Sequence, residues 1–249
     1  MYPYIFYIAG NSPASRAAGH ALIQSGITVS PLPNKDVTHL LLPIPSLDDA
    51  GNIRGVGSVS GLLEQLSSDV TIIGGNLKHP VLDNASCIDL LKDPIYLAEN
   101  ASITAYCALR LILMELPCIL KNCPVLIVGW GRIAQCLAQL LKSAGANITI
   151  AARKTESRAI ASALGYNVCE INNLQTGDYR VIINTAPAPD IIKEQDCNTD
   201  CLKIDLASIK GIQGKHVILA RGLPGKDAPE TTGKLIVKRT LALIQEEAV

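Results

Sequence analysis

Short apolar runs alternate along this chain with amphipathic stretches, and the alternation continues through both halves of the sequence. The apolar runs lie at residues 4–10, 27–32, 39–44, 70–75, 125–128, 147–150, 181–184, 202–205 and 217–220. The stretches with helical periodicity lie at residues 13–25, 60–66, 102–120, 132–142 and 229–247. Strands that alternate with helices form parallel sheets, so the pattern predicts an α/β protein.

The elements fall into two groups, which predicts two Rossmann-like parallel-sheet domains joined by a long helix. We assign residues 1–99 together with 226–249 to an N-terminal α/β domain on the substrate side, and residues 121–225 to a Rossmann domain. The helix at 100–120 would bridge them. Ligands of parallel sheets collect beyond the carboxyl ends of the strands, so the loops at those ends are the first candidates for a site.

The strand predicted at 125–128 runs into a Gly-Trp-Gly turn and then into a helix. This is a G-x-G-x-x-A dinucleotide-binding turn, with Ala134 in place of the third glycine. Gly129 permits the tight turn, Gly131 lets a pyrophosphate approach the backbone, and the helix N-terminus favours its negative charge. The alternative is a glycine-bearing turn without a ligand. A second apolar strand at 147–150 completes the expected unit and favours the dinucleotide site.

The end of that second strand predicts which dinucleotide binds. An NAD site usually has a carboxylate there, which accepts a hydrogen bond from the ribose 2′-OH. This chain instead has Arg153, Lys154 and Thr155. The two cations can pair with a 2′-phosphate and the hydroxyl can donate to it, so NADP is the predicted cofactor. The alternative is a solvated basic turn.

Loops after later strands of the same domain complete the predicted cofactor site, because they follow the strands at 181–184 and 202–205. The predicted cofactor-binding residues are Gly129, Gly131, Arg132, Ile133, Arg153, Lys154, Thr155, Thr185, Ala186, Pro187, Leu206 and Ala207.

Composition excludes several other classes of function. The 22 basic and 22 acidic residues cancel, which argues against nucleic acid or an anionic membrane as a partner. No apolar run approaches the roughly 20 residues of a membrane span, and the first residues lack a basic signal region. Eight cysteines include no Cys-x-x-Cys pair, so we expect no metal site, no disulfide framework and a reducing cytoplasmic location.

Several loop motifs of this chain together carry a family resemblance. The most specific is Gly-Leu-Pro-Gly at 222–225, followed by Ala-Pro-Glu-Thr-Thr-Gly at 228–233. The other motifs are Asn-Ala-Ser-Ile-Thr at 100–104, Val-Gly-Trp-Gly-Arg at 128–132, Ala-Arg at 152–153, Ile-Asn-Thr at 183–185 and Ile-Asp-Leu-Ala-Ser at 204–208. With these motifs the chain resembles one family, the A subunits of dipicolinate synthase. The resemblance spans most of the chain and is strongest from residue 100 onward.

The resemblance implies an NADP-dependent oxidation of a dihydrodipicolinate-type ring to dipicolinate in sporulation. It also implies a partner, the flavoprotein-like B subunit, and leaves a homo-oligomer open. Cationic clamps are expected for a small dicarboxylate substrate. The cation candidates are Arg16, Arg54, Lys78 and Arg221. We expect Arg221, Thr104 and Asn76 to bind the substrate in a cleft between the domains. The catalytic residue is not assigned.

The chain also departs from the family pattern. Where the family usually has Thr-x-Glu-Gly, this chain has Thr104-Ala105-Tyr106-Cys107, and Arg221 stands where the family usually has proline. The missing Glu supports two alternatives. One is a non-catalytic dinucleotide-binding partner or sensor, and the other is a hydroxyacid or imine dehydrogenase with another substrate. His79 is the only histidine expected near a strand's carboxyl end, either as an acid or base or as a plain loop residue.

Overall fold

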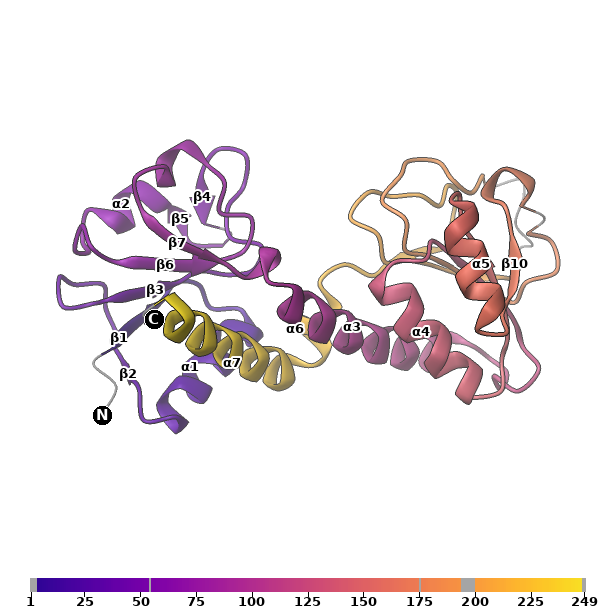
Figure 1. The fold of residues 1–249 in the computed structure, drawn as a ribbon, viewed down its shortest axis with the longest axis horizontal. Coiled ribbons are helices and arrows are strands. Elements are labelled where there is room, and N and C mark those ends of the chain that lie inside the picture. The colour runs from indigo at the N-terminus through magenta and orange to yellow at the C-terminus, as the bar shows by residue number, and fades with distance from the viewer. Residues whose placement is uncertain (1–3, 54, 175, 194–199, 248–249) are drawn as a thin grey trace. The chain divides into compact units, whose positions relative to one another are not determined.

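The computed structural model describes residues 4–53, 55–174, 176–193 and 200–247, and Figure 1 shows their ribbon. The chain folds into two units. Unit 1 comprises Met1–Asn100 with Pro224–Val249, and unit 2 comprises Ala101–Leu223. Each unit is built on a parallel sheet with helices packed against it, so the predicted α/β class with two Rossmann-like sheets is confirmed.

The unit 1 sheet has five parallel strands in the order β2-β1-β3-β6-β7. The strands are β1 (Ile5–Ile8), β2 (Thr28–Val29), β3 (His39–Leu41), β6 (Thr71–Gly74) and β7 (Ser86–Asp89). The remaining elements before the long helix are α1 (Pro13–Gln24), β4 (Asn52–Ile53), β5 (Gly57–Ser58), α2 (Val59–Leu63), η1 (Pro80–Leu82) and η2 (Leu90–Lys92). The strand order reverses between β1 and β3, which is where doubly wound sheets bind ligands.

Helices α1 and α7 (Pro229–Glu247) lie side by side in unit 1 (Figure 1). Their approach depends on small residues. A β-carbon added at Gly233 would stand 2.6 Å from the backbone carbon of Ala17 and 2.6 Å from the nitrogen of Ala18. Real β-carbons do not come so close to backbone atoms, so glycine is required at this crossing. Ser12 caps α1, because its hydroxyl accepts from the Ser15 N–H at 3.0 Å.

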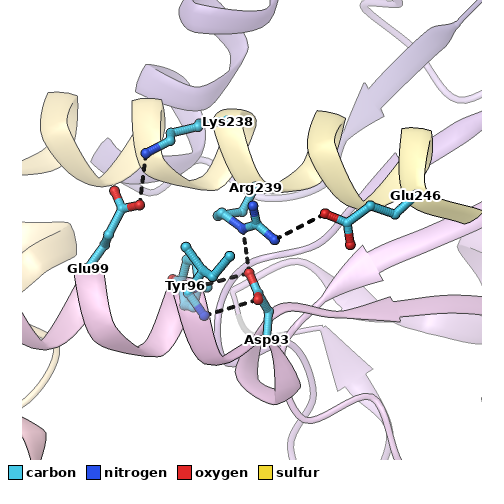
Figure 2. Close-up of polar contacts among 7 residues, drawn as sticks. Asp93, Tyr96, Glu99, Lys238, Arg239 and Glu246 are labelled. Atoms are coloured by element: carbon cyan, nitrogen blue, oxygen red, sulfur yellow. Dashed lines mark hydrogen bonds and ion pairs between the residues drawn. The ribbon is translucent and has the colours of Figure 1, made fainter.

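A buried ion pair joins α7 to the start of the long helix α3 (Pro94–Glu115), as Figure 2 shows. Arg239 Nε donates to Asp93 Oδ2 at 2.6 Å, and both side chains are buried. The Asp93 carboxylate also accepts the backbone N–H groups of Ile95 and Tyr96, each at 3.1 Å. Asp93 therefore caps α3 and anchors α7 with one carboxylate.

The unit 2 sheet has six parallel strands in the order β10-β9-β8-β11-β12-β13, which is the 3-2-1-4-5-6 order of a Rossmann domain. The strands are β8 (Pro124–Val128), β9 (Asn147–Ala151), β10 (Asn167–Cys169), β11 (Val181–Asn184), β12 (Leu202–Asp205) and β13 (Val217–Leu219). The other elements are α4 (Arg132–Ser143), α5 (Thr155–Ala163), η3 (Ile171–Asn173) and α6 (Leu223–Asp227), whose last residues belong to unit 1.

Periodicity explains the core of unit 2. The central strands β8 and β11 are apolar almost throughout because both faces of the sheet are covered, and all four residues of β11 are buried. Helix α4 buries Ala134, Leu137, Ala138 and Leu141, which recur at helical spacing on one face. The strand order reverses between β8 and β11, so the predicted dinucleotide-binding turn after β8 lies at the switch point.

Several element boundaries differ from those predicted. Helix α3 begins at Pro94 and ends at Glu115, so it starts earlier and ends earlier than the 102–120 pattern. The Asp93 cap with Pro94 at the first helical position explains the start, and Pro117 explains why no helix continues. The loop expected at 221–225 contains the start of the short helix α6. Strands β7 and β10 were not predicted, because both are short and partly polar.

Candidate functional site

The turn after β8 is shaped by Gly129. Its φ is +104°, a left-handed conformation that L side chains rarely adopt. A β-carbon there would also collide with the Thr185 hydroxyl and lie 3.2 Å from the Ala186 nitrogen. Thr185 itself is held at the switch point, because its backbone N–H and its hydroxyl both donate to the Val128 carbonyl at 2.8 Å. The turn after β8 and the loop after β11 therefore form one packed edge.

Gly131 differs from Gly129, because it faces open space. Its φ of −83° suits any residue, and no atom lies within 4 Å of an added β-carbon. It is the N-cap of α4, and no side chain caps this helix end. The N–H groups of the first turn of α4 are therefore available to an anion beside an open backbone. Arg132 is exposed and Ile133 half-buried at the same helix start.

The turn after β9 carries three exposed residues suited to a phosphate: Arg153, Lys154 and Thr155. A fourth residue, Arg158, organises this turn and was not singled out from the sequence. Its guanidinium donates to the carbonyls of Ala152 and Arg153, both at 2.7 Å, and to the Thr155 hydroxyl at 3.2 Å. Arg158 thus adds positive charge and holds the turn in shape, as expected of a preorganised anion site.

Trp130 is the chain's only tryptophan, and it lies between the two glycines of the turn after β8. Its ring packs edge-on against Tyr166, with the centroids 5.6 Å apart. Lys142 lies over the other aromatic ring, 4.6 Å from the Tyr166 centroid. The fluorescence of Trp130 therefore reports on the predicted phosphate turn.

A buried polar pair shapes the loops after β11 and β12. Asn184 and Asp205 are both fully buried, and Asn184 Nδ2 donates to Asp205 Oδ1 at 3.2 Å. Asn184 Oδ1 accepts from the Ala186 N–H at 3.0 Å. Asp205 accepts three more N–H groups, from Ala207 at 3.1 Å, Gly211 at 2.7 Å and Ile212 at 3.1 Å. These contacts fix loops that carry predicted cofactor residues.

Sequence reasoning named the loop residues and missed the pair that supports them. Thr185 and Ala186 are half-buried and Pro187 is exposed, whereas Leu206 and Ala207 are buried. The missed signal was a polar residue at the last position of two otherwise buried strands. Such a side chain is well placed to hydrogen-bond the backbone of the loop that follows.

The predicted substrate residues lie in both units, so their convergence stays a prediction. Asn76 is exposed after β6 with φ +59°, and its backbone N–H donates to Asp89 Oδ1 at 3.1 Å. Thr104 is buried in the unit 2 part of α3, and Arg221 is exposed after β13. Each one follows a strand or lies on α3, as the sequence indicates.

The other predicted cations have less support. Arg16 is exposed and donates to the carbonyl of Asn11 at 2.6 Å and to its side-chain oxygen at 3.0 Å, so Asn11 holds it after β1. Lys78 is exposed. Arg54 lies outside the described residues.

His79 and His39 both have structural roles in unit 1. His79 Nδ1 accepts the Val81 N–H at 3.3 Å and so caps η1, while its ring packs against Gly51. His39 is buried in β3, stacked on Phe6 with the ring centroids 4.9 Å apart. Burial lowers the pKa of His39. Within the described ranges, no group of three or more His, Cys, Asp or Glu could hold a metal ion, and no helix could cross a membrane.

Comparison with known proteins finds a matching family model and several structural relatives. The model of the acetohydroxy acid isomeroreductase NADPH-binding domain matches residues 119–212. The dipicolinate synthase A subunit of Bacillus subtilis (strain 168) is 24% identical over 247 residues, covering 88% of this chain and 82% of that protein. The crystal structure of the dipicolinate synthase A subunit from Bacillus halodurans gives a TM-score of 0.82 at 20% identity and covers 97% of both chains.

A second crystal structure, of the dipicolinate synthase A chain from Bacillus subtilis, gives a TM-score of 0.80 at 20% identity, covering 99% of this chain and 98% of that one. The resemblance to the A subunits of dipicolinate synthase that the sequence motifs predict is therefore confirmed. The NADPH-binding family model falls on unit 2 and includes the turn at Gly129 and Gly131 and the basic turn after β9.

Proposed function

We propose that this protein is an NADP-dependent oxidoreductase that works as the A subunits of dipicolinate synthase do, acting in sporulation. Its substrate would be a dihydrodipicolinate-type ring, oxidised to dipicolinate. The observation that carries the proposal is the switch-point site of unit 2. There the open backbone at Gly131 and the N-terminus of α4 suit a pyrophosphate, and a preorganised basic turn follows the neighbouring strand β9.

The residues present fit NADP. Gly131 leaves the space a pyrophosphate needs, and the first N–H groups of α4 would donate to it. Arg153, Lys154 and Thr155 would hold the 2′-phosphate, with Arg158 fixing their turn. Thr185 and Ala186 would border the nicotinamide side, because they follow β11 at the switch point. When bound, NADP supplies the hydride acceptor.

The oxidation requires little from the protein beyond placement. A dihydropyridine ring loses a hydride to the cofactor and a proton to solvent or a nearby acceptor, and the product is aromatic. That gain in aromatic stability favours the step, so orientation matters more than a strong base. We propose that Arg221 pairs with a ring carboxylate and that Thr104 and Asn76 orient the ring. Tyr106 stands at the family's Glu position, and its phenol hydroxyl could donate a hydrogen bond to the substrate.

A partner protein, a flavoprotein resembling the B subunit of dipicolinate synthase, is part of the proposal. Three large apolar side chains of α3 in unit 2, those of Tyr106, Leu113 and Met114, are exposed. Exposed apolar residues that gather on one helix are typical of surfaces that another protein covers. The second candidate is a non-catalytic dinucleotide-binding protein, and it rests on the replacement of Glu by Tyr106.

Cofactor choice is tested by titration. NADPH and NADH are added to the wild type while Trp130 fluorescence is followed, and the Arg153→Ala variant is compared with Arg110→Ala, an exposed arginine of α3. We expect NADPH to bind more tightly, and Arg153→Ala to narrow the preference by about 1 kcal/mol or more. The control variant Arg110→Ala should leave the preference for NADPH over NADH unchanged. Equal affinity of the wild type for both dinucleotides would remove the NADP assignment.

Turnover is tested separately. NADP reduction is measured with a freshly prepared dihydrodipicolinate precursor, with and without the flavoprotein partner. Tight NADPH binding combined with no turnover in either mixture would favour the non-catalytic alternative. Turnover of a 2-hydroxy acid in place of the ring substrate would favour the hydroxyacid dehydrogenase alternative.

A further inference from the structure

One carboxylate, that of Asp205, joins the loops that follow β11 and β12. Asn184 and Asp205 lie opposite each other as the last residue pair of these two strands, and both are fully buried. Asp205 Oδ1 accepts from Asn184 Nδ2 at 3.2 Å and from the Ala207 N–H at 3.1 Å. Asp205 Oδ2 accepts from the N–H groups of Gly211 at 2.7 Å and Ile212 at 3.1 Å. Each oxygen accepts two hydrogen bonds, which together use the roughly four acceptor positions of a carboxylate.

Asn184 extends this network to the loop after β11. Its Oδ1 accepts the Ala186 N–H at 3.0 Å, and its Nδ2 also donates to the Ala186 carbonyl at 3.2 Å. Between these two residues, Thr185 donates its N–H and its hydroxyl to the Val128 carbonyl, both at 2.8 Å. The start of this loop is therefore held on one side by the end of β8 and on the other by Asp205.

Gly211 lets the two loops approach each other closely. Its N–H is held by Asp205, and its carbonyl accepts the Ile192 N–H at 3.0 Å. A β-carbon added at Gly211 would collide with Asn184 Nδ2 and would stand 2.9 Å from the Ala188 carbonyl oxygen. Real β-carbons do not come so close to such atoms, so a side chain at position 211 must push the two loops apart.

We propose that Asn184, Asp205 and Gly211 are positioning residues for the nicotinamide half of the dinucleotide. This inference rests on the proposed function, in which Thr185 and Ala186 border the nicotinamide. All three positioning residues are buried, so they act through the backbone of the two loops and not by contact with the dinucleotide. The network keeps this backbone in one arrangement before the dinucleotide binds, and such preorganisation strengthens binding.

Binding of the adenine half should not depend on this network. The basic turn that carries Arg153 follows β9, and the strand order places β8 and β11 between β9 and β12. With neighbouring strands about 4.8 Å apart, β9 and β12 are separated by about 14 Å, and changes at such a distance usually act independently. Disturbing the network should therefore weaken what the nicotinamide half adds to binding and leave the adenine half unaffected.

The test compares NADPH with 2′,5′-ADP, a fragment that has the adenine and the 2′-phosphate but no nicotinamide. Calorimetry on the full chain gives the Kd of each compound, and the ratio of the two values measures what the nicotinamide half adds to binding. Asp205→Asn removes acceptor positions, whereas Gly211→Ala separates the loops and keeps every polar side chain of the network. In each variant the ratio should fall about ten-fold or more, while the Kd of 2′,5′-ADP should stay within about two-fold of the wild type.

Gly61→Ala, in α2 of unit 1, is the matched control for Gly211→Ala. No atom lies within 4 Å of a β-carbon added at Gly61, so the control should change neither Kd. Far-UV circular dichroism and urea unfolding establish that each variant is folded. If Asp205→Asn does not fold, Gly211→Ala decides the outcome, because it retains the Asn184 and Asp205 side chains.

Two kinds of failure can be told apart. The proposal is overturned if a folded variant keeps the wild-type ratio, or if its affinity for 2′,5′-ADP falls as much as its affinity for NADPH. It is also overturned if the wild type binds NADPH no more tightly than 2′,5′-ADP. A wild type that binds neither compound instead refutes the proposed cofactor site itself.

Discussion

The contrast between two neighbouring ion pairs on α3 and α7 gives the sharpest stability prediction (Figure 2). Asp93 pairs with Arg239, and Glu99 pairs with Lys238 at 2.8 Å. The two pairs join the same two helices through adjacent residues of α7, and both bonds are short. They differ in burial, because the Asp93 and Arg239 side chains are 5% and 8% exposed, whereas Glu99 and Lys238 are 40% and 63% exposed.

The matched changes are Asp93→Asn and Glu99→Gln, which remove one negative charge each and nearly preserve shape. Asp93→Asn leaves Arg239 as a buried charge whose other carboxylate, Glu246, is 3.8 Å away and mostly exposed. Breaking a buried pair in this way costs about 3–5 kcal/mol. Asparagine still caps a helix well, so the loss should lie near the lower end, about 3 kcal/mol. Glu99→Gln should cost less than about 1 kcal/mol, because solvent screens the exposed pair.

Urea unfolding measures the loss of unfolding free energy in both variants. Far-UV circular dichroism follows the whole chain, while Trp130 fluorescence follows unit 2, so comparing the two transitions assigns the loss to unit 1. Raising the salt concentration should shrink the small effect of Glu99→Gln more than that of Asp93→Asn. If the two variants lose the same free energy within about 0.5 kcal/mol, burial does not decide the strength of these pairs and the reasoning is wrong.

The same pair predicts a pH dependence. Burial by itself would raise the pKa of Asp93, but the hydrogen bond from Arg239 and those from the Ile95 and Tyr96 N–H groups outweigh it, and the pKa is lowered. A lowered carboxyl pKa gives stability that is present above the ordinary value of 3.8 and is lost as pH falls toward the folded-state value. The wild type should lose more stability than Asp93→Asn in that range.

Four further predictions concern single residues. Gly131→Val should abolish NADPH binding in titrations. The unfolding free energy should change by only about 0.5 kcal/mol, because no atom lies within 4 Å of the added β-carbon. Normal NADPH binding by the folded variant would place the cofactor elsewhere. Gly233→Ala should cost about 2 kcal/mol in urea unfolding, since α1 and α7 must separate, and an unchanged midpoint would contradict that crossing. Burial lowers the pKa of His39, so the stability of unit 1 should be full above pH 6.5 and decline below it. Urea unfolding at a series of pH values should show a smaller decline for His39→Gln than for the wild type. Arg221→Ala should lower kcat/KM for the ring substrate about ten-fold or more in the NADP-reduction assay, and unchanged turnover would remove Arg221 from the substrate site.

The sequence determined the fold class and the position of the glycine turn after β8, where we predict the dinucleotide. Strands that are buried on both faces of a sheet are continuous apolar runs, and helices that cover a sheet have apolar residues at helical spacing. Both patterns lie within a short stretch of sequence, so they can be recognised without the structure. Gly129 was also visible, because its left-handed backbone conformation needs glycine whatever surrounds it. Gly131 was visible only as part of the G-x-G-x-x-A motif, because its own backbone conformation suits any residue. The loop motifs carried the resemblance to the A subunits of dipicolinate synthase, which comparison then confirmed.

Short polar elements and helix limits were less visible from the sequence. Strands β7 and β10 contain few buried residues, so they exist because a neighbouring strand pairs with them. The start of α3 depends on the Asp93 cap, which Arg239 holds from a residue far away along the chain. Such elements are stabilised by residues that lie far away in the sequence, so the nearby sequence does not predict them.

Only the tertiary structure decided which polar residues work together. It brought Asp205 and Asn184 into one buried network and placed the Arg158 guanidinium on the backbone carbonyls of the basic turn. The sequence around each residue does not name its partner, because the partner lies in another segment of the chain. A hydrogen bond or an ion pair gains its strength from burial and geometry, and both are properties of chain segments that meet only in the folded protein. The sequence therefore located the candidate site, and the packing of the strands and loops supplied the contacts that shape it.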